Sequence, residues 1–270
     1  MLTRRPARCA RPSAGARLGR SLFAGAAALS VLLLSLSAAA QTRAWPMRHV
    51  DRDLAVPRHT LRLDGGPRWP LPSGQLSHYV HRDADDALLL RVGASFGITE
   101  NLELGFVQPL LLHPEGDLQN PTFHGTYQFG RGTVDVGVFW GVGIPYEGHL
   151  VLRGGIPLYI HAGERVRLDL GAFLRSEFPQ DNTTVDLEVP FLVPINVTPQ
   201  VFLGPEVAMI TWGGFEDVAV PVGFFVGYTI VTGGGTLGDI SGRIRETDVR
   251  SPRAFDQVEL LVAADLFFDL

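Results

Sequence analysis

Apolar and polar residues alternate along most of this chain, from residue 88 to its C-terminus. The pattern is clearest in Leu102-Glu103-Leu104-Gly105 and Val134-Asp135-Val136-Gly137, and it recurs in Leu168-Asp169-Leu170-Gly171 and Val201-Phe202-Leu203-Gly204. A period of two is that of a β-strand whose two faces meet different environments. The sequence therefore predicts an all-β fold.

The alternation predicts about 12 strands, an even number as in bacterial outer-membrane barrels. The first strand is expected over residues 60–65, a long loop over 66–86, and the last strand over 258–269. Tight and longer connections take turns along the chain, as periplasmic turns and external loops do in such barrels. We therefore expect residues 58–270 to form a closed antiparallel up-and-down transmembrane β-barrel with both ends in the periplasm.

A soluble β-protein would alternate too, but its wet face usually carries many polar side chains. Here that face is mostly glycine, alanine and single charges, whereas the other is a long series of Val, Leu, Ile and Phe. One protein core could hardly cover so many apolar faces, and lipid could. Four aromatic residues near predicted strand ends suit membrane girdles: Trp140, Trp212, Phe129 and Phe268.

Six prolines fall inside or near the predicted strands, where each leaves a backbone ladder bond unmade. They are Pro109, Pro157, Pro190, Pro194, Pro205 and Pro221. We expect bulges at these positions, or strand boundaries that differ from the predicted ones. The pattern is weakest around Pro190–Pro194 and after Gly235.

Residues 1–40 have the layout of a secretory signal peptide: six arginines, an apolar run over 22–36, and Ala38-Ala39-Ala40 before Gln41. The alternative, a membrane-anchoring helix, fits less well because the run is short for a span. Residues 41–57 are predicted to be an irregular periplasmic lead-in or a plug in the lumen. We expect the mature protein in the cell outer membrane.

The only cysteine, Cys9, lies in this leader, so the mature chain holds no disulfide. The chain has 23 basic residues, and losing the leader's six arginines leaves 17 against 28 acidic residues, a charge of −11. Such an acidic chain argues against nucleic acid as a partner.

The segment Phe96-Gly97-Ile98-Thr99-Glu100-Asn101-Leu102-Glu103-Leu104-Gly105 resembles a turn-and-strand motif of Gram-negative outer-membrane β-barrel proteins. These include the transporter-like barrels named for the MetA pathway of phenol degradation. Val197-Thr198-Pro199-Gln200-Val201-Phe202-Leu203-Gly204 repeats the motif more loosely. The resemblance implies outer-membrane lipid, the barrel-insertion machinery and small solutes as partners. Many such barrels end in an aromatic residue, whereas this chain ends in Leu270, with Phe268 two places earlier.

Three carboxylates, Glu103, Asp135 and Asp169, each follow the first apolar residue of a strand that rises from a tight turn. They should point into the lumen at similar height, and such a ring would favour cations. The favoured interpretation is that they pair with Arg167, Arg153 or Arg91 and fill the interior, since polar lumens are usual in such barrels. The complete set of lumen-lining candidates is Glu103, Asp135, Asp169, Arg153, Arg167, Glu206 and Asp265.

His78 and His81, close to three aspartates, are weak candidates for a metal site, and an ordinary exposed loop is the favoured interpretation. No catalytic motif or cofactor signature is present in the sequence, and we expect no enzyme. The favoured function is a passive outer-membrane channel or transporter-like protein for small solutes. The alternatives are a non-transporting barrel with a structural or surface-contact role, and a soluble periplasmic β-protein that binds a ligand.

Overall fold

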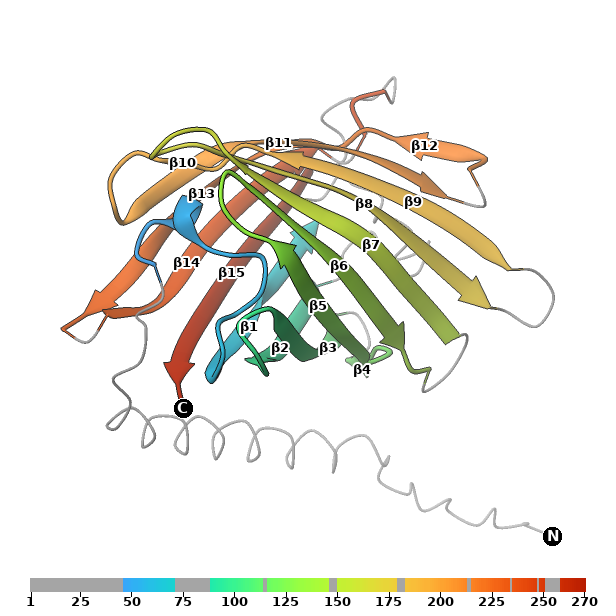
Figure 1. Cartoon of the computed structure of the whole chain (residues 1–270). Helices are drawn as coiled ribbons and strands as arrows, with labels where there is room; N and C mark the ends of the chain where they lie inside the picture. Colours follow the sequence, from blue (N-terminus) through green and yellow to red (C-terminus); the bar gives the residue numbers. More distant parts are fainter. Residues whose placement is uncertain are drawn as a thin grey trace, which may run out of the picture. The chain divides into compact units, whose positions relative to one another are not determined.

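The computed structural model describes residues 46–70, 88–113, 116–145, 150–178, 183–212, 215–233, 235–246, 248–250 and 258–270. In these ranges the chain forms one antiparallel sheet (Figure 1). No helix within them is long and apolar enough to cross a membrane. The elements are η1 (His49–Asp51), β1 (Thr60–Pro70), β2 (Leu88–Gly97), β3 (Leu102–His113), β4 (Asp117–Leu118), β5 (Thr122–Gly130), β6 (Val134–Gly143), β7 (Leu150–His161), β8 (Arg167–Phe178), β9 (Thr184–Leu192), β10 (Ile195–Asn196), β11 (Val201–Trp212), β12 (Asp217–Ala219), β13 (Val222–Thr232), β14 (Gly235–Glu246) and β15 (Val258–Asp269).

The sheet is a closed barrel of 12 strands with up-and-down topology, as the sequence predicted. Three of the 15 segments are short pieces, β4, β10 and β12, each of which shares a strand with β5, β9 and β13 respectively. Pairing of β1 with β15, from Thr60 opposite Asp269 onward, closes the sheet. Full strands of 9–12 residues are long enough to cross a bilayer at the usual tilt.

Prolines lie where two of the barrel strands are interrupted. Both outcomes expected at the prolines occur, a bulge and a changed strand boundary. Pro194 and Pro221 lie between the pieces of interrupted strands, whereas the other four stay inside strands. Two of those four still bond to the neighbouring interrupted strand, because the carbonyl of Pro109 accepts from Gln119 N (3.1 Å) and that of Pro205 from Val193 N (3.1 Å). Beside Pro109 the register shifts by one residue, since Val107 pairs with Thr122 but Leu110 with Leu118, which is a bulge. Beside Pro205 the register continues unbroken from Leu203 opposite Ile195 to Glu206 opposite Leu192.

One predicted boundary was wrong. Residues 66–70 were expected in a loop but extend β1, where Arg68–Pro70 pair with Glu259–Leu261 of β15. Gly66 and Pro67 had hidden this extension by interrupting the alternation. The strand after Gly235, where the sequence pattern is weak, is present, and β14 pairs along both edges with β13 and β15.

Two of the tight turns share one hydrogen-bonding scheme, which gives the repeated sequence motif its physical basis. Thr99 Oγ1 accepts from the backbone N–H of Asn101 (3.2 Å) and Leu102 (3.0 Å). Thr198 Oγ1 accepts likewise from Gln200 (3.3 Å) and Val201 (2.9 Å). A threonine hydroxyl that bonds to the backbone two and three residues onward stabilises such a turn locally. Both turns lie at the same end of the barrel, here called the short-turn end.

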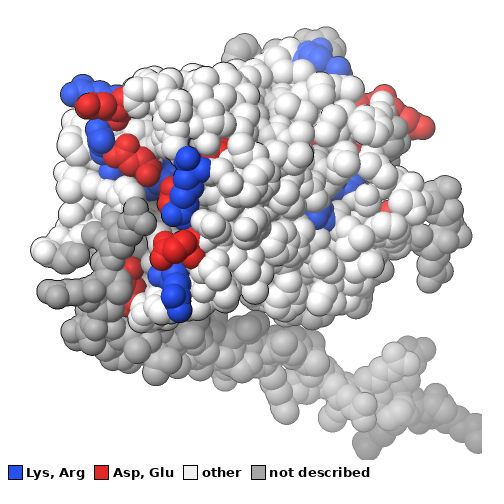
Figure 2. Space-filling view, viewed as in Figure 1, with Lys and Arg blue, Asp and Glu red and all other residues white. Residues whose placement is uncertain are grey.

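The barrel has apolar side chains outside and polar side chains inside, the reverse of a soluble core. Charged and polar residues dominate the buried positions, and large apolar residues are exposed along nearly every strand. On the face shown in Figure 2, charges gather mainly at the side of the short-turn end, and the wall beside them is almost uncharged. The exposed apolar residues include Leu104, Phe123, Val138, Val142, Ile156, Leu174, Phe224, Val226, Ile240, Ile244 and Val262.

We predict that Val226→Arg, at an exposed position midway along β13, destabilises the folded barrel in lipid by about 2–4 kcal/mol, because a guanidinium would enter hydrocarbon. The matched control is Ala263→Arg, whose side chain would enter the water-filled interior. Urea titration in lipid vesicles, followed by gel mobility without boiling, measures both. Equal stability of the two variants would contradict a lipid-facing Val226.

Candidate functional site

The candidate site is the polar interior of the barrel. The sequence-predicted residues come from β3 (Glu103), β6 (Asp135), β7 (Arg153), β8 (Arg167 and Asp169), β11 (Glu206) and β15 (Asp265). Each alternates with apolar neighbours that face outward, so all seven share the inner face. They do not form one cluster: Glu103, Asp135, Arg167 and Asp169 lie at the short-turn end, and the others lie deeper.

The carboxylates at the short-turn end are engaged with partners instead of forming an open ring. The buried Glu103 accepts from Arg62 Nη2 (2.8 Å) and from the backbone N–H of Val56 (2.8 Å). Asp135, also buried, accepts from Gly132 N (2.9 Å) and lies 3.0 Å from His161 Nε2. Sequence spacing identified neither Arg62 nor His161 as a partner, because both lie on other strands at separations set by register alone.

Residues 46–59, here called the N-terminal segment, cross the lumen at the short-turn end. Three backbone N–H groups of this segment bond to inner side chains of separate strands. Val50 N donates to Asn196 Oδ1 of β10 (3.0 Å), Ala55 N to Gln128 Oε1 of β5 (3.3 Å), and Val56 N to Glu103 of β3. Irregular backbone needs such partners once it leaves water. The wall therefore carries dedicated acceptors for this segment.

Arg52 is the main charged anchor of the N-terminal segment. Its guanidinium binds both carboxylate oxygens of Asp239 on β14, one of them at 2.9 Å, and donates to Thr229 Oγ1 on β13 (3.1 Å). Thr229 donates in turn to Asp239 Oδ1 (2.8 Å). Arg52 and Asp239 are both buried. A two-pronged arginine–carboxylate pair of this kind is both strong and geometrically specific.

Arg167 holds the same segment from another part of the wall, on β8, which β9 and β11 separate from β13. Its Nη1 donates to the carbonyls of His49 (2.9 Å) and Arg52 (3.0 Å), while Nε and Nη2 bind Asp169 at 2.5 and 2.8 Å. The guanidinium also lies 3.9 Å from the ring centre of Tyr159. Asp169 thus orients an arginine that satisfies two backbone carbonyls of the segment.

Gly97 permits the close contact between the N-terminal segment and the wall. A Cβ at this position would lie only 1.9 Å from the carbonyl oxygen of Pro57. Nearby, His59 N donates to the carbonyl of Gly97 (2.9 Å). Any side chain at residue 97 would push the end of the segment away from β2.

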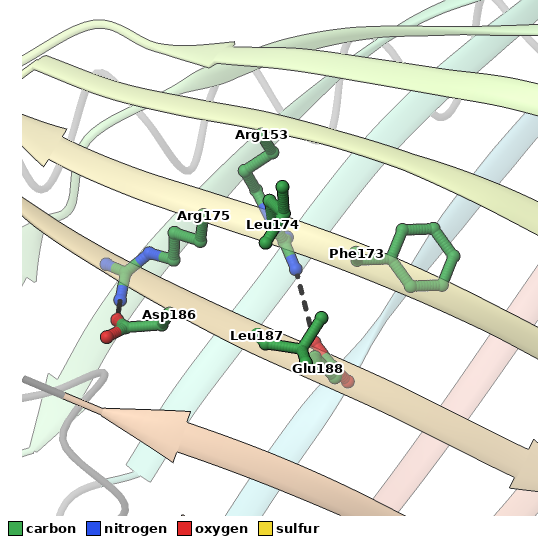
Figure 3. Close-up of a pocket in the computed structure, with 7 residues that line it drawn as sticks. All are labelled: Arg153, Phe173, Leu174, Arg175, Asp186, Leu187 and Glu188. Atoms are coloured by element: carbon green, nitrogen blue, oxygen red, sulfur yellow. Dashed lines mark ion pairs between the residues drawn. The ribbon is translucent and has the colours of Figure 1, made fainter. Parts of the chain in front are cut away.

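Beyond the segment, arginine–carboxylate pairs line the inner wall. On β7, β8 and β9, Arg153 lies 3.5 Å from Glu188, and Arg175 lies 3.9 Å from Asp186 (Figure 3). Phe173 lies on the same stretch of wall and contacts the ring of Phe139 edge-on, with centroids 5.9 Å apart. This part of the lumen is therefore a mixed charged and aromatic surface.

A cavity with a volume of about 500 Å³ lies against β1, β2, β3, β14 and β15. Its charged lining consists of Arg62, Arg91, Arg243, Asp64 and Asp265. In the part of the chain that the structure describes, no three His, Cys, Asp or Glu residues are grouped so as to hold a metal ion. His78 and His81 lie outside the described residues.

Comparison with solved structures relates this fold to outer-membrane channels. The chain is similar to the COG4313 outer membrane channel from Pseudomonas putida F1, with 13% identity over 79% of this chain and 97% of that one, at a TM-score of 0.55. The NanC porin is similar at 10% identity, 77% and 100% coverage and a TM-score of 0.55. The KdgM porin follows at 7% identity, 76% and 98% coverage and 0.54. No family model and no curated protein matches the sequence.

We predict that Arg52→Met releases the N-terminal segment, because breaking a buried ion pair costs about 3–5 kcal/mol. The reporter is Ala55→Cys, a fully buried position within residues 41–270, which otherwise lack cysteine, in a protein that begins at Gln41. Maleimide labelling of this reporter thiol should be slow in the parent and at least about tenfold faster with Arg52→Met. The control is Arg48→Met, which removes a more exposed pair with Asp51 and an exposed bond to the carbonyl of Glu164. Equal labelling rates in all three proteins would contradict an anchoring role for Arg52.

Docking of the segment should weaken in acid through His49. Its ring stacks on Phe202 at 4.3 Å, and this burial, followed by the charges of Arg167 and Arg52, holds the pKa of His49 well below its usual range. A released His49 binds a proton at a higher pH than the docked one, so the docking free energy has its full value above about pH 6.5 and declines as the pH falls below it. Labelling of the Ala55→Cys reporter, normalised to the urea-unfolded protein at each pH, should accelerate in acid, and His49→Gln should flatten that profile.

Proposed function

We propose that this chain is a passive outer-membrane channel for small solutes, of the transporter-like type named for the MetA pathway of phenol degradation. The observation that carries the proposal is a closed barrel with an apolar exterior and a polar interior holding a cavity of about 500 Å³. A barrel of this size lies between those filled by side chains and the wide aqueous porins. Narrow passage of small molecules is the function that suits such a lumen.

The partners follow from the same features. Outer-membrane lipid covers the exposed apolar side chains, and the barrel-insertion machinery delivers the chain to that membrane after export by the N-terminal signal peptide. Paired charges in a water-filled lumen suit conduction of solutes rather than a chemical reaction. Nucleic acid is not an expected partner for a mature chain of this acidity.

The N-terminal segment supports a second candidate, a barrel that does not transport. The segment crosses the lumen and is held by Asn196, Gln128, Glu103, Asp239 and Arg167. If these bonds persist, the short-turn end stays shut. We favour a channel because the anchors are side-chain contacts to a short irregular stretch, which can open locally while the barrel stays folded.

A soluble periplasmic β-protein is the least favoured alternative. It would need a protein layer over the exposed apolar face, and within the described ranges the barrel wall carries no second sheet or helix on that side. Membrane fractionation tests this alternative directly, since a soluble protein would stay in the supernatant without detergent.

Single-channel recording in planar bilayers tests the proposed function. We expect the purified full-length mature protein to give discrete conductance steps, with Arg52→Met spending more time in a larger open level than the parent or Arg48→Met. The physical reason is that the freed N-terminal segment no longer obstructs the lumen. No current above that of empty bilayers in any of the three proteins, with folding checked by gel mobility, would leave the non-transporting barrel as the correct assignment.

A further inference from the structure

The cavity against β1, β2, β3, β14 and β15 exposes its positive charges more than its negative ones. In the pair of Arg91 with Asp64, 3.7 Å apart, the arginine side chain is 59% exposed and the aspartate 16%. For Arg243 with Glu206, at 3.1 Å, the values are 36% and 6%. In the pair of Arg62 with Glu103, the arginine is 27% exposed and the glutamate 2%.

A common geometry explains this asymmetry. The Asp or Glu side chain is shorter, so its carboxylate stays near the wall. The arginine side chain is longer, extends past the carboxylate and keeps its guanidinium toward the water. An entering solute therefore meets guanidinium N–H donors before it meets carboxylate oxygens. The negative charge of the chain lies behind this positive layer and is partly neutralised by it.

We propose that this cavity binds a small organic anion bearing one or more carboxylates, held by Arg62, Arg91 and Arg243. The inference rests on the proposed function and adds the solute class to it. Three guanidiniums reach one cavity from β1, β2 and β14. Their planar donor geometry matches carboxylate oxygens better than it matches a spherical ion.

The rest of the lining fits an organic body attached to the carboxylate. Pro67, Leu89, Pro109 and Leu261 contribute apolar surface to the same cavity. The volume of about 500 Å³ falls within the range of small-molecule sites. A binding site in a channel must also release its ligand. Because the arginines are partly exposed, water competes for their guanidiniums and keeps the strength of each contact with the ligand moderate.

Asp265 opposes the binding of an anion and provides an internal check. It lines the cavity from β15, directly across from Asp64 on β1. Within the described residues, Asp265 makes no hydrogen bond or ion pair. Removing its charge should therefore strengthen anion binding, the opposite of the effect of removing an arginine.

The experiment measures reversal potentials in a KCl gradient and block of the chloride current by citrate in the full-length mature protein. We expect anion preference, and citrate block about tenfold weaker when Arg91→Gln and Arg243→Gln are combined, since hydrogen bonds to charged groups contribute about that factor. Asp265→Asn should strengthen block about threefold by removing a screened like charge. Arg250→Gln, an exposed arginine on an outer connection, should leave both readouts unchanged.

The outcomes separate this inference from the proposed function. A protein that conducts but prefers cations, or whose citrate block survives the double variant, would overturn the anion site and leave the channel intact. Absence of conductance would overturn the channel. In that case, calorimetric titration of citrate into the detergent-solubilised protein and its double variant decides the site, and equal binding to both would overturn it. Gel mobility without boiling verifies that each variant is folded.

Discussion

The requirement that every backbone polar group find a partner away from water governs this molecule. Hydrocarbon supplies no hydrogen bonds, so a sheet that crosses a membrane must have no free edge. Pairing of β1 with β15 meets that requirement, because it joins the first strand to the last along nine residue pairs. The prolines are tolerated for the same reason, because the carbonyls of Pro109 and Pro205 still accept from backbone N–H groups of the neighbouring strand. Closure fixes the outside of the barrel as apolar and leaves all polar chemistry to the inside.

Inside the barrel, the same need for partners explains why charges and irregular backbone occur together. The N-terminal segment is irregular, so its backbone N–H and carbonyl groups need partners inside the lumen. Side-chain oxygens of Asn196, Gln128 and Glu103 on the barrel wall accept from three of these N–H groups. Arg167 supplies the donors that the carbonyls of His49 and Arg52 need. Because each of these side chains has a second partner or a rigid strand beneath it, the segment is held by a network rather than by one contact.

Much of the barrel followed from the sequence, because strand alternation and turn chemistry are local. The period of two identified nearly every strand, and Thr99 and Thr198 identify two turns that close by the same hydroxyl bonds. Where a proline or glycine interrupted the period, as at Gly66-Pro67, the prediction stopped too early. The contacts inside the barrel were harder to predict from the sequence. Glu103 meets Arg62, and Asp239 meets Arg52, only because strand register and barrel closure bring together residues that are far apart in the sequence.

The sign of the lumen's field illustrates what a residue count omits. The sequence carries more acidic than basic side chains, and a cation-favouring ring was the less favoured interpretation of the carboxylates near the tight turns. Side-chain length changes that interpretation, because an arginine and a carboxylate rooted on the same wall end at different depths in the lumen. Glu206 lies buried at the wall while Arg243 extends beside it, and Glu103 stands in the same relation to Arg62. A charge pair that is neutral by count is thus a dipole whose positive end faces the lumen, and several such dipoles aligned around one cavity add rather than cancel.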